Sequence, residues 1–287
     1  MPRSKERELS SKSAGVQELA PRTLGPEVQD ILRQTEEVSG RRIRVVRDPT
    51  LPTWAAVRVA KSEAAAHTIR YAPRQEAHLG YLIAHECGHL LRLWSVPPEA
   101  RMMPCIGKEQ RETAQHRLRQ ELPALIRYLP EAAQRSLLRL WHEGIVRQVS
   151  TYPADVRIEE WMFEQLPEMR SSQRAALVRQ LKENELVLVP RVESITSQSV
   201  YRASVAMNCA FAHFAAALLQ EPSLSGPYPD QARQKARKLF WELHCERESG
   251  NLGDVAVSKR WSEVLDLSGW FKWIRLDATS EMNVSFI

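Results

Sequence analysis

Hydrophobic positions divide the chain into a short strand-forming part and a longer helical part. Residues 26–40 carry apolar side chains at close to helical spacing, with Pro26 suited to the first turn and Gly40 suited to the stop. Short runs rich in β-branched and aromatic residues follow, and they predict strands at 43–46, 56–59 and 67–71.

From residue 76 onward the apolar spacing is helical almost to the end of the chain. The first of these helices is expected to end before Pro97, and Pro153 is expected to begin another. The further helices are predicted at 108–128, 130–147, 154–166, 171–184, 197–219, 229–247 and 255–273. Strands that come first and helices that follow indicate an α+β protein with a small N-terminal sheet and a large, mostly helical remainder.

The composition is that of an ordinary globular protein. Of the 287 residues, 43% are hydrophobic and 26% are charged, which excludes a chain that is disordered throughout. The net charge of +5 is mildly basic, so it permits an acidic partner without requiring one. Direct binding to nucleic acid is not expected, and the composition leaves the oligomeric state open.

Cysteine spacing and apolar runs bear on the compartment. No two of the four cysteines form a CxxC pair, which excludes a zinc ribbon and argues against a disulfide scaffold. Residues 1–22 hold no apolar run that could serve as a signal peptide. The most apolar stretch, 205–219, is shorter than the roughly 20 residues that cross a bilayer. We therefore expect a soluble, cytoplasmic protein with no membrane segment.

The segment that points to chemistry is the HExxH sequence at 85–89, inside a predicted helix. Residues four apart lie on one helix face, so His85 and His89 can both reach one Zn²⁺. Glu86 follows the first histidine and is placed to act as a general base, taking the proton from a water that attacks a carbonyl. Two core histidines with ordinary hydrogen bonds would give the same spacing, but each would need its own buried partners.

A catalytic zinc site needs a third protein ligand, and a carboxylate downstream is the best candidate. Glu159 has Val156, Met162 and Phe163 as helical neighbours, and a carboxylate among apolar side chains is expected to be paired or bound to metal. Glu160 instead faces charged neighbours. The sequence therefore favours Glu159 as the third ligand.

Asp155 lies one helical turn before Glu159 and has two interpretations. It could accept the second ring N–H of a ligand histidine, as carboxylates behind metal ligands do. It could equally be an acid in the first turn of a helix, where the helix dipole favours negative charge. The sequence does not decide between them.

These residues resemble the ImmA/IrrE-like zinc metallopeptidases. The likeness rests on a helix, short strands, the run Tyr81 to Leu91 around the HExxH sequence, and a later helical glutamate, and it covers roughly residues 26–166. It implies a zincin-like fold, a gluzincin-type site and cleavage of a specific protein, in several members a DNA-binding repressor. It also implies that the strand 67–71 is an edge strand that pairs with an extended substrate.

With this resemblance we predict a domain organisation and a function. Residues 1–25 would be a flexible lead-in, 26–170 a metallopeptidase domain with a helical insertion near 98–150, and 171–287 a helical region packed on it. The predicted function is a zinc-dependent metalloendopeptidase that acts on a protein or peptide, such as a cytoplasmic transcriptional repressor. The alternative is a catalytically silent binding or regulatory module that keeps the fold.

The residue that stabilises the oxyanion stays open at this point. Zinc peptidases often use a hydrogen-bond donor for the tetrahedral oxyanion, and the chain offers Tyr71, Tyr152 and Tyr201. The substrate, any activator and the role of the C-terminal helices are not indicated by the sequence.

Overall fold

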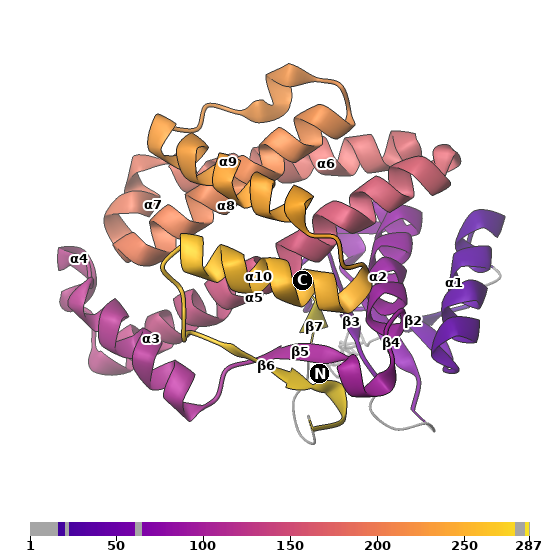
Figure 1. Ribbon diagram of the computed structural model, residues 1–287, viewed down its shortest axis with the longest axis horizontal. Helices are drawn as coiled ribbons and strands as arrows, with labels where there is room; N and C mark the ends of the chain where they lie inside the picture. The colour runs from indigo at the N-terminus through magenta and orange to yellow at the C-terminus, as the bar shows by residue number, and fades with distance from the viewer. Residues whose placement is uncertain (1–16, 21–22, 61–64, 279–284, 287) are drawn as a thin grey trace, which may run out of the picture.

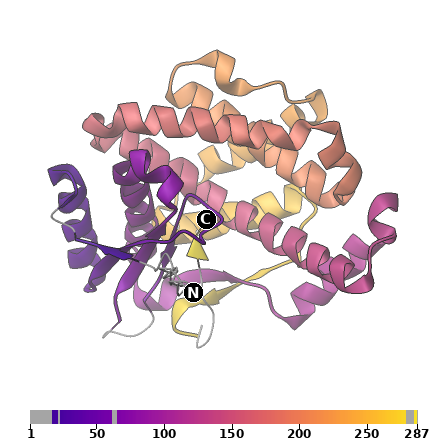
Figure 2. The same cartoon turned by 180° about the vertical axis from the view of Figure 1, so that it is seen from behind.

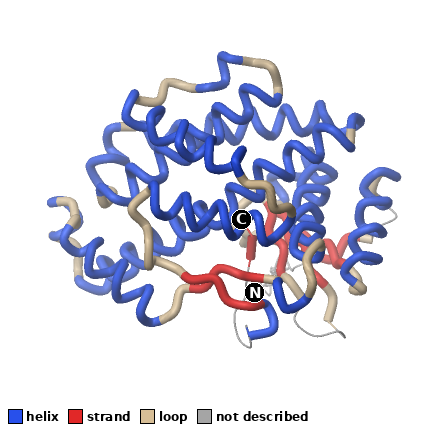
Figure 3. Tube along the Cα trace, in the orientation of Figure 1, coloured by secondary structure: helices blue, strands red, loops and turns tan. Residues whose placement is uncertain are grey.

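The computed structural model of the protein describes residues 17–20, 23–60, 65–278 and 285–286, the last pair as backbone only. It is an α+β structure in which helices dominate and a small mixed sheet lies to one side (Figure 3). The strands are β1 (Gln17–Leu19), β2 (Ile43–Arg47), β3 (Ala55–Arg58), β4 (His67–Tyr71), β5 (Met102–Cys105), β6 (Lys272–Arg275) and β7 (Ser285–Phe286).

The helices follow the predicted pattern in outline. They are α1 (Pro26–Ser39), α2 (Leu79–Trp94), α3 (Lys108–Gln120), α4 (Ala124–Arg127), α5 (Glu131–Gln165), α6 (Arg170–Glu185), α7 (Pro190–Ile195), α8 (Gln198–Leu218), α9 (Asp230–Cys245) and α10 (Gly250–Val264). Helices α1 and α4 lie at opposite ends of the long axis (Figure 1), and the view from behind agrees (Figure 2).

The main sheet has the strand order β1-β2-β4-β3-β7. Strands β2 and β4 are parallel, and the other neighbours are antiparallel. Val45, Ile69 and Val57 are direct partners across β2, β4 and β3, and all three are buried. Side chains alternate between the two faces of a sheet, so this row marks the face that packs on α2.

Strand β4 is not an edge strand, so that expectation from the resemblance is wrong. It pairs with β2 along one side and with β3 along the other, and its backbone cannot accept a further strand. The strand nearer the edge is β3, which pairs with β7 at Val57 and Arg58.

The sequence pattern does not predict every element. Residues 17–19 fall in the predicted lead-in 1–25, yet they form β1 and pair with β2; residues 1–16 and 21–22 lie outside the described part. Strands β5 and β6 form a separate antiparallel pair that joins residues 102–105 to residues 272–275. Such pairing between distant short segments leaves little local signature, because neither segment alternates strongly.

The predicted break in the long helix before residue 154 is also wrong. Helix α5 runs through Pro153, which is buried in the helix interior. Proline cannot donate to the carbonyl of Val149, so one helical hydrogen bond is absent there. Packing on both sides compensates for this loss, because residues on either side of Pro153 are core residues.

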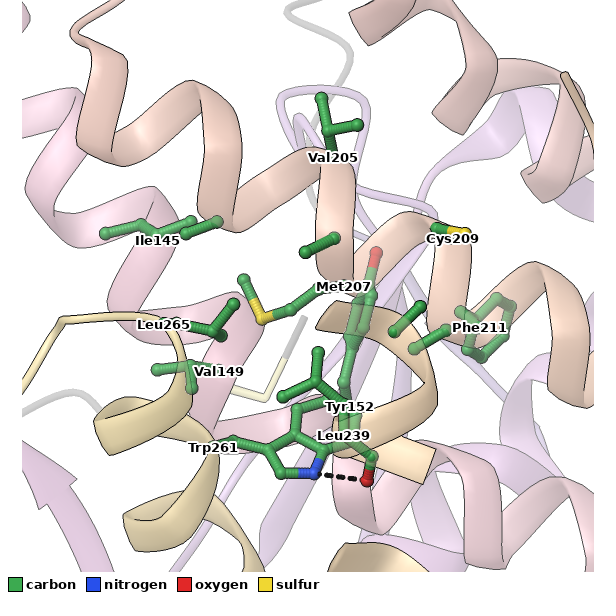
Figure 4. Packing of buried hydrophobic residues seen from close by; sticks show 14 of the residues in the cluster. Ile145, Val149, Tyr152, Val205, Met207, Cys209, Phe211, Leu239, Trp261 and Leu265 are labelled. Atoms are coloured by element: carbon green, nitrogen blue, oxygen red, sulfur yellow. Dashed lines mark hydrogen bonds between the residues drawn. The ribbon is translucent and has the colours of Figure 1, made fainter. Parts of the chain in front are cut away.

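Two hydrophobic clusters share α5. One contains the sheet, α1, α2 and the α5 residues Ala154, Ile158 and Met162. The other is helical and joins α5 to α3, α6, α8, α9 and α10. Figure 4 shows part of this second cluster, where the indole N–H of Trp261 donates to the carbonyl of Leu239 at 2.9 Å. In the described part of the chain, none of the helices has the length and apolar character required to cross a membrane.

The contact between α2 and α5 depends on Gly88. A Cβ atom at this position would lie 2.7 Å from Cγ2 of Ile158, closer than ordinary van der Waals contact. The absence of a side chain therefore lets the two helices approach one another beside the HExxH sequence.

We predict that Gly88→Ala destabilises the protein by about 1–2 kcal/mol, because overpacking outweighs the gain in helix propensity. Chemical denaturation measures the change. Gly144→Ala is the matched control: it is also in a helix, but a Cβ atom there would have no neighbour within 4 Å, so this change should be neutral or stabilising.

A double-mutant cycle tests the cause. Ile158→Ala should cost less stability in the Gly88→Ala protein than in the unmodified one, because the smaller side chain relieves the clash. Additive effects would mean that Ile158 is not what restricts this position.

Candidate metal centre

Helix α2 holds both histidines of the HExxH sequence on its inner face. The ring centroids of His85 and His89 are 5.1 Å apart, as expected for side chains one helical turn apart. The His89 side chain is almost completely buried, whereas the His85 side chain retains 13% of its exposure. The pair therefore lies at the bottom of an opening rather than on the surface.

Helix α5 brings the carboxylate of Asp155 between the two rings. Its Oδ1 lies 3.1 Å from Nε2 of His89 and 3.6 Å from Nε2 of His85. One ligand atom from each of these three residues lies within 4.8 Å of the others, which makes them a group that could hold a metal ion. The three residues come from two helices that cross at Gly88.

Asp155 is unusual for a buried carboxylate. It is 2% exposed, and neither of its oxygens makes a well-aligned hydrogen bond within the described part of the chain. Burial by itself would raise the pKa of Asp155, but the neighbouring imidazoles of His85 and His89 hold it below its ordinary value. A charged, buried carboxylate with both oxygens available for further bonds is characteristic of a metal ligand.

Glu159 occupies a different position, behind His85. Its Oε1 accepts from the hydroxyl of Tyr81 at 2.6 Å and lies 2.8 Å from Nδ1 of His85. Its Oε2 accepts from Nε2 of Gln173 at 2.6 Å. Both carboxylate oxygens are therefore engaged by protein groups.

The contact with Glu159 also determines which nitrogen of His85 is available. If Nδ1 carries the proton and donates to Glu159, the lone pair of the neutral ring is on Nε2, the nitrogen that faces Asp155. Burial opposes a charge on His85, but the carboxylates of Asp155 and Glu159 hold its pKa well above the usual value. The cluster thus has a surplus of negative charge that suits a cation.

The structure places the two carboxylates differently from the sequence-based expectation. The sequence favours Glu159 as the third ligand and leaves Asp155 open, either behind a histidine or as an acid in the first turn of a helix. In the structure Asp155 lies between the imidazoles, and Glu159 lies at Nδ1 of His85. Both residues are on the same face of α5, one turn apart, so the sequence identified the pair but not the order. Contacts run in opposite order along α2 and α5, since Tyr81 meets Glu159 and His89 meets Asp155.

Glu86 is buried next to this group. It is 2% exposed, and its Oε2 has no hydrogen-bond partner among the described residues. Burial raises the pKa of Glu86 to about 8, against the opposing effects of His85 and the backbone of Val57 in β3. A carboxylate with a raised proton affinity at a cavity wall can accept a proton, as a general base must.

A cavity of about 470 Å³ opens onto the cluster. His85, Glu86 and Asp155 form part of its wall. The remaining wall comes from residues 52–55, which lead into β3, from residues 74–75, from the start of α2, from one side each of α5 and α6, and from Phe211 of α8. A substrate in this cavity would therefore contact His85, Asp155 and Glu86 together.

The three tyrosines considered for the oxyanion are separated by the structure. Tyr152 lines the cavity, and its hydroxyl donates to Oδ1 of Asn208 at 3.1 Å. Tyr201 lines another cavity, beside α9, and Tyr71 is buried in β4 and lines neither of the two cavities. Tyr152 is thus the only one of the three that faces the cluster.

Two further residues were not anticipated from the sequence. Tyr81 precedes His85 by one helical turn, so helical spacing alone places it on the face of α2 that carries the two histidines. Gln173 comes from α6 and donates both to the side chain and to the backbone carbonyl of Glu159. Nothing in its neighbouring sequence indicates this role.

Comparison with protein-family models, with curated proteins and with solved structures gives no match to this chain.

Proposed function

We propose that this protein is a zinc-dependent metallopeptidase, with His85, His89 and Asp155 as the metal ligands. The observation that carries the proposal is the buried Asp155 carboxylate, which has no well-aligned hydrogen bond on either oxygen and faces Nε2 of two histidines. We assign Asp155, rather than Glu159, as the third ligand because both oxygens of Glu159 are already engaged by protein donors.

The donor set fits zinc better than the other common metals. Two imidazole nitrogens and one carboxylate oxygen are ligands that Zn²⁺ prefers, whereas Mg²⁺ and Ca²⁺ prefer oxygen alone. Catalytic zinc sites keep one position open, and the cavity lies on the open side of this cluster. When bound, the ion would act as a Lewis acid towards a carbonyl and lower the pKa of water.

Residues of the chain would supply the other catalytic roles. Glu86 takes the proton from the attacking water, and it returns a proton to the leaving amine. Tyr152 is the candidate donor to the developing oxyanion, because it lines the same cavity, and its hydroxyl would have to exchange its hydrogen bond to Asn208 for one to the oxyanion. The wall around residues 52–55 would exclude bulk water from the peptide bond once a substrate is bound.

Glu159 has a positioning role in this proposal. It orients the ring of His85 through Nδ1, while Tyr81 and Gln173 fix the carboxylate in turn. Carboxylates behind a ligand histidine select its tautomer and increase its basicity as a ligand. The buried charge of Glu159 is thus compensated by protein donors, without a contact to the metal.

The zincin-like fold and the likeness to ImmA/IrrE-like peptidases remain part of the proposal. They are supported by the HExxH helix packed against a small mixed sheet and by a third ligand from a later helix. The substrate on this view is a protein or peptide, bound beside residues 52–55 and β3 rather than along β4.

Metal content provides the most direct test. The purified protein should hold about one Zn²⁺ per chain, because three protein ligands converge in one group. His85→Ala should abolish stoichiometric zinc, measured by elemental analysis, and His116→Ala should not, since His116 is an exposed histidine on α3. Full retention of zinc in His85→Ala would refute the metal centre.

A second experiment separates the two carboxylates. Asp155→Ala should remove stoichiometric zinc, whereas Glu159→Ala should retain the site but weaken zinc affinity by about 10–100-fold, the usual effect of losing a carboxylate behind a ligand. Competition with a chromophoric chelator measures both affinities. Glu160→Ala, the adjacent glutamate outside the cluster, is the control and should leave zinc affinity unchanged. The opposite ranking of Asp155 and Glu159 would restore Glu159 as the ligand.

Catalysis is tested through the general base. Glu86→Gln preserves shape but removes the proton acceptor, so zinc content should be retained and peptide cleavage should fall by about 10² or more. Mass spectrometry of a proteome-derived peptide library provides the assay without a known substrate. Undiminished cleavage by Glu86→Gln would assign the general base elsewhere. A zinc-loaded, unmutated protein that cleaves nothing would instead favour the silent binding module.

A further inference from the structure

The cavity beside the metal cluster contains several hydrogen-bond donors that lack acceptors. Nε2 of Gln75, Oγ1 of Thr151 and Nδ2 of Asn184 are buried, and they have no hydrogen-bond partner within the described part of the chain. Gln75 and Thr151 are 1% and 3% exposed, so their polar atoms are well removed from solvent. Buried donors of this kind are costly unless water or a ligand in the cavity supplies acceptors.

One guanidinium on the cavity wall, that of the exposed residue Arg147, is also uncommitted. Arg147 lines the cavity, and its side chain makes no hydrogen bond or ion pair with any described residue. The other two arginines of the wall are engaged. Arg74 donates to the carbonyls of residues 51–53, and Arg179 donates to Gln75 and forms an ion pair with Glu183 at 3.1 Å.

The uncommitted groups follow the metal ligand along one face of α5. Arg147, Thr151 and Asp155 are spaced by four residues, so they form a row along the cavity wall. At a rise of 1.5 Å per residue, Thr151 is about 6 Å and Arg147 about 12 Å from Asp155 along the helix axis. An extended peptide advances by about 3.3–3.6 Å per residue, so Thr151 lies about two residues and Arg147 about three to four residues of substrate from Asp155, and a carboxylate held between them lies about two to three residues away.

From this arrangement we propose that Arg147 and Thr151 form a subsite for a carboxylate, two to three residues from the bond to be cleaved. The inference rests on the proposed peptidase function and adds its substrate class: peptides that carry an acidic side chain or a free C-terminal carboxylate at that distance. A carboxylate supplies acceptors both to the planar guanidinium and to the Thr151 hydroxyl. Gln75 and Asn184 add donors elsewhere on the cavity wall.

The acids of the cavity do not cancel this preference. Glu183 is held by Arg179 and by the indole N–H of Trp54 at 3.1 Å. Asp155 and Glu86 lie at the end of the cavity beside the histidines, where a bound cation would balance their charge. Arg74 and Arg147 are therefore the cations of the cavity wall that have no acidic partner among the described residues, and of the two only Arg147 has a guanidinium that donates to none of them.

The test uses the zinc-loaded, full-length protein and short peptide hydroxamates, whose hydroxamate group binds zinc. Three ligands are compared by calorimetry: one with Glu at the second or third residue and an amidated end, one with Gln in its place, and one with Gln and a free C-terminal carboxylate. The Glu and Gln ligands are each made in two versions, with the hydroxamate at the N-terminal or at the C-terminal end of the peptide. The version that binds more tightly shows in which direction the peptide runs through the cavity. Acetohydroxamate reports on the metal alone.

We expect the Glu ligand, the free-carboxylate ligand, or both to bind about tenfold more tightly than the neutral ligand in one direction, the scale of a hydrogen bond to a charged group. The ligand whose affinity increases shows whether the bound carboxylate is a side chain or a chain terminus. Arg147→Gln should reduce the ratio to near one, and Thr151→Val should reduce it in part. Arg139→Gln, an exposed arginine on α5 outside the cavity, should leave the ratio unchanged.

The outcomes separate this subsite from the peptidase itself. Equal binding of all three ligands in both directions, or a ratio that survives Arg147→Gln, overturns the subsite while acetohydroxamate binding still supports the metal centre. Absence of zinc and of any hydroxamate binding overturns the proposed function, and the subsite with it.

Discussion

The close crossing of α2 and α5 is the contact on which the candidate site depends. Gly88 has no side chain, and Ile158 fills the space that a Cβ atom would occupy. The crossing places His85 and His89 opposite Asp155 and Glu159, although these carboxylates follow the HExxH sequence by more than sixty residues. A wider separation of the helices would carry the Asp155 carboxylate away from both rings, because an aspartate side chain is short.

The same crossing brings three buried carboxylates together, and their burial opposes folding unless their charge is compensated. Asp155, Glu159 and Glu86 are each nearly inaccessible to solvent. Burying carboxylates is expensive unless they are paired, hydrogen-bonded or bound to metal. Glu159 meets this requirement through Tyr81, His85 and Gln173, all of which belong to the protein. Both oxygens of Asp155 and Oε2 of Glu86 have no well-aligned hydrogen-bond partner among the described residues, and for this reason these are the two groups to which we assign roles in binding and proton transfer.

How far the sequence predicts this structure depends on whether the feature is local. The HExxH helix and the strands at 43–47, 55–58 and 67–71 have clear local patterns, and the structure confirms them within a residue or so. The α+β class follows from their order. The continuation of α5 through Pro153 cannot be predicted from the local pattern, because proline usually ends a helix. Here tertiary packing on both sides keeps the helix continuous. The position of β4 inside the sheet is likewise a matter of pairing between distant segments.

The order of the two carboxylates has the same origin. Helical periodicity groups Asp155 with Glu159 on one face, but it contains no information on which of them lies opposite the histidines. That choice is made by the register of the crossing, in which Gly88 meets Ile158 and Tyr81 meets Glu159. An apolar environment around Glu159 suggests a metal ligand, yet it suits equally well a carboxylate that is fully satisfied by protein donors.

Helix α5 therefore carries a sequence of functions along a single face. Glu159 contacts Nδ1 of His85, Asp155 lies between both histidines, and Thr151 and Arg147 continue the row into the cavity. A helix is stiff on this length scale, so the distance between Asp155 and Arg147 is set by the helix and not by a loop. Core packing on both sides of Pro153 holds this part of α5 in place. The helix that we propose supplies the third metal ligand would thus also set the distance at which a substrate group is selected.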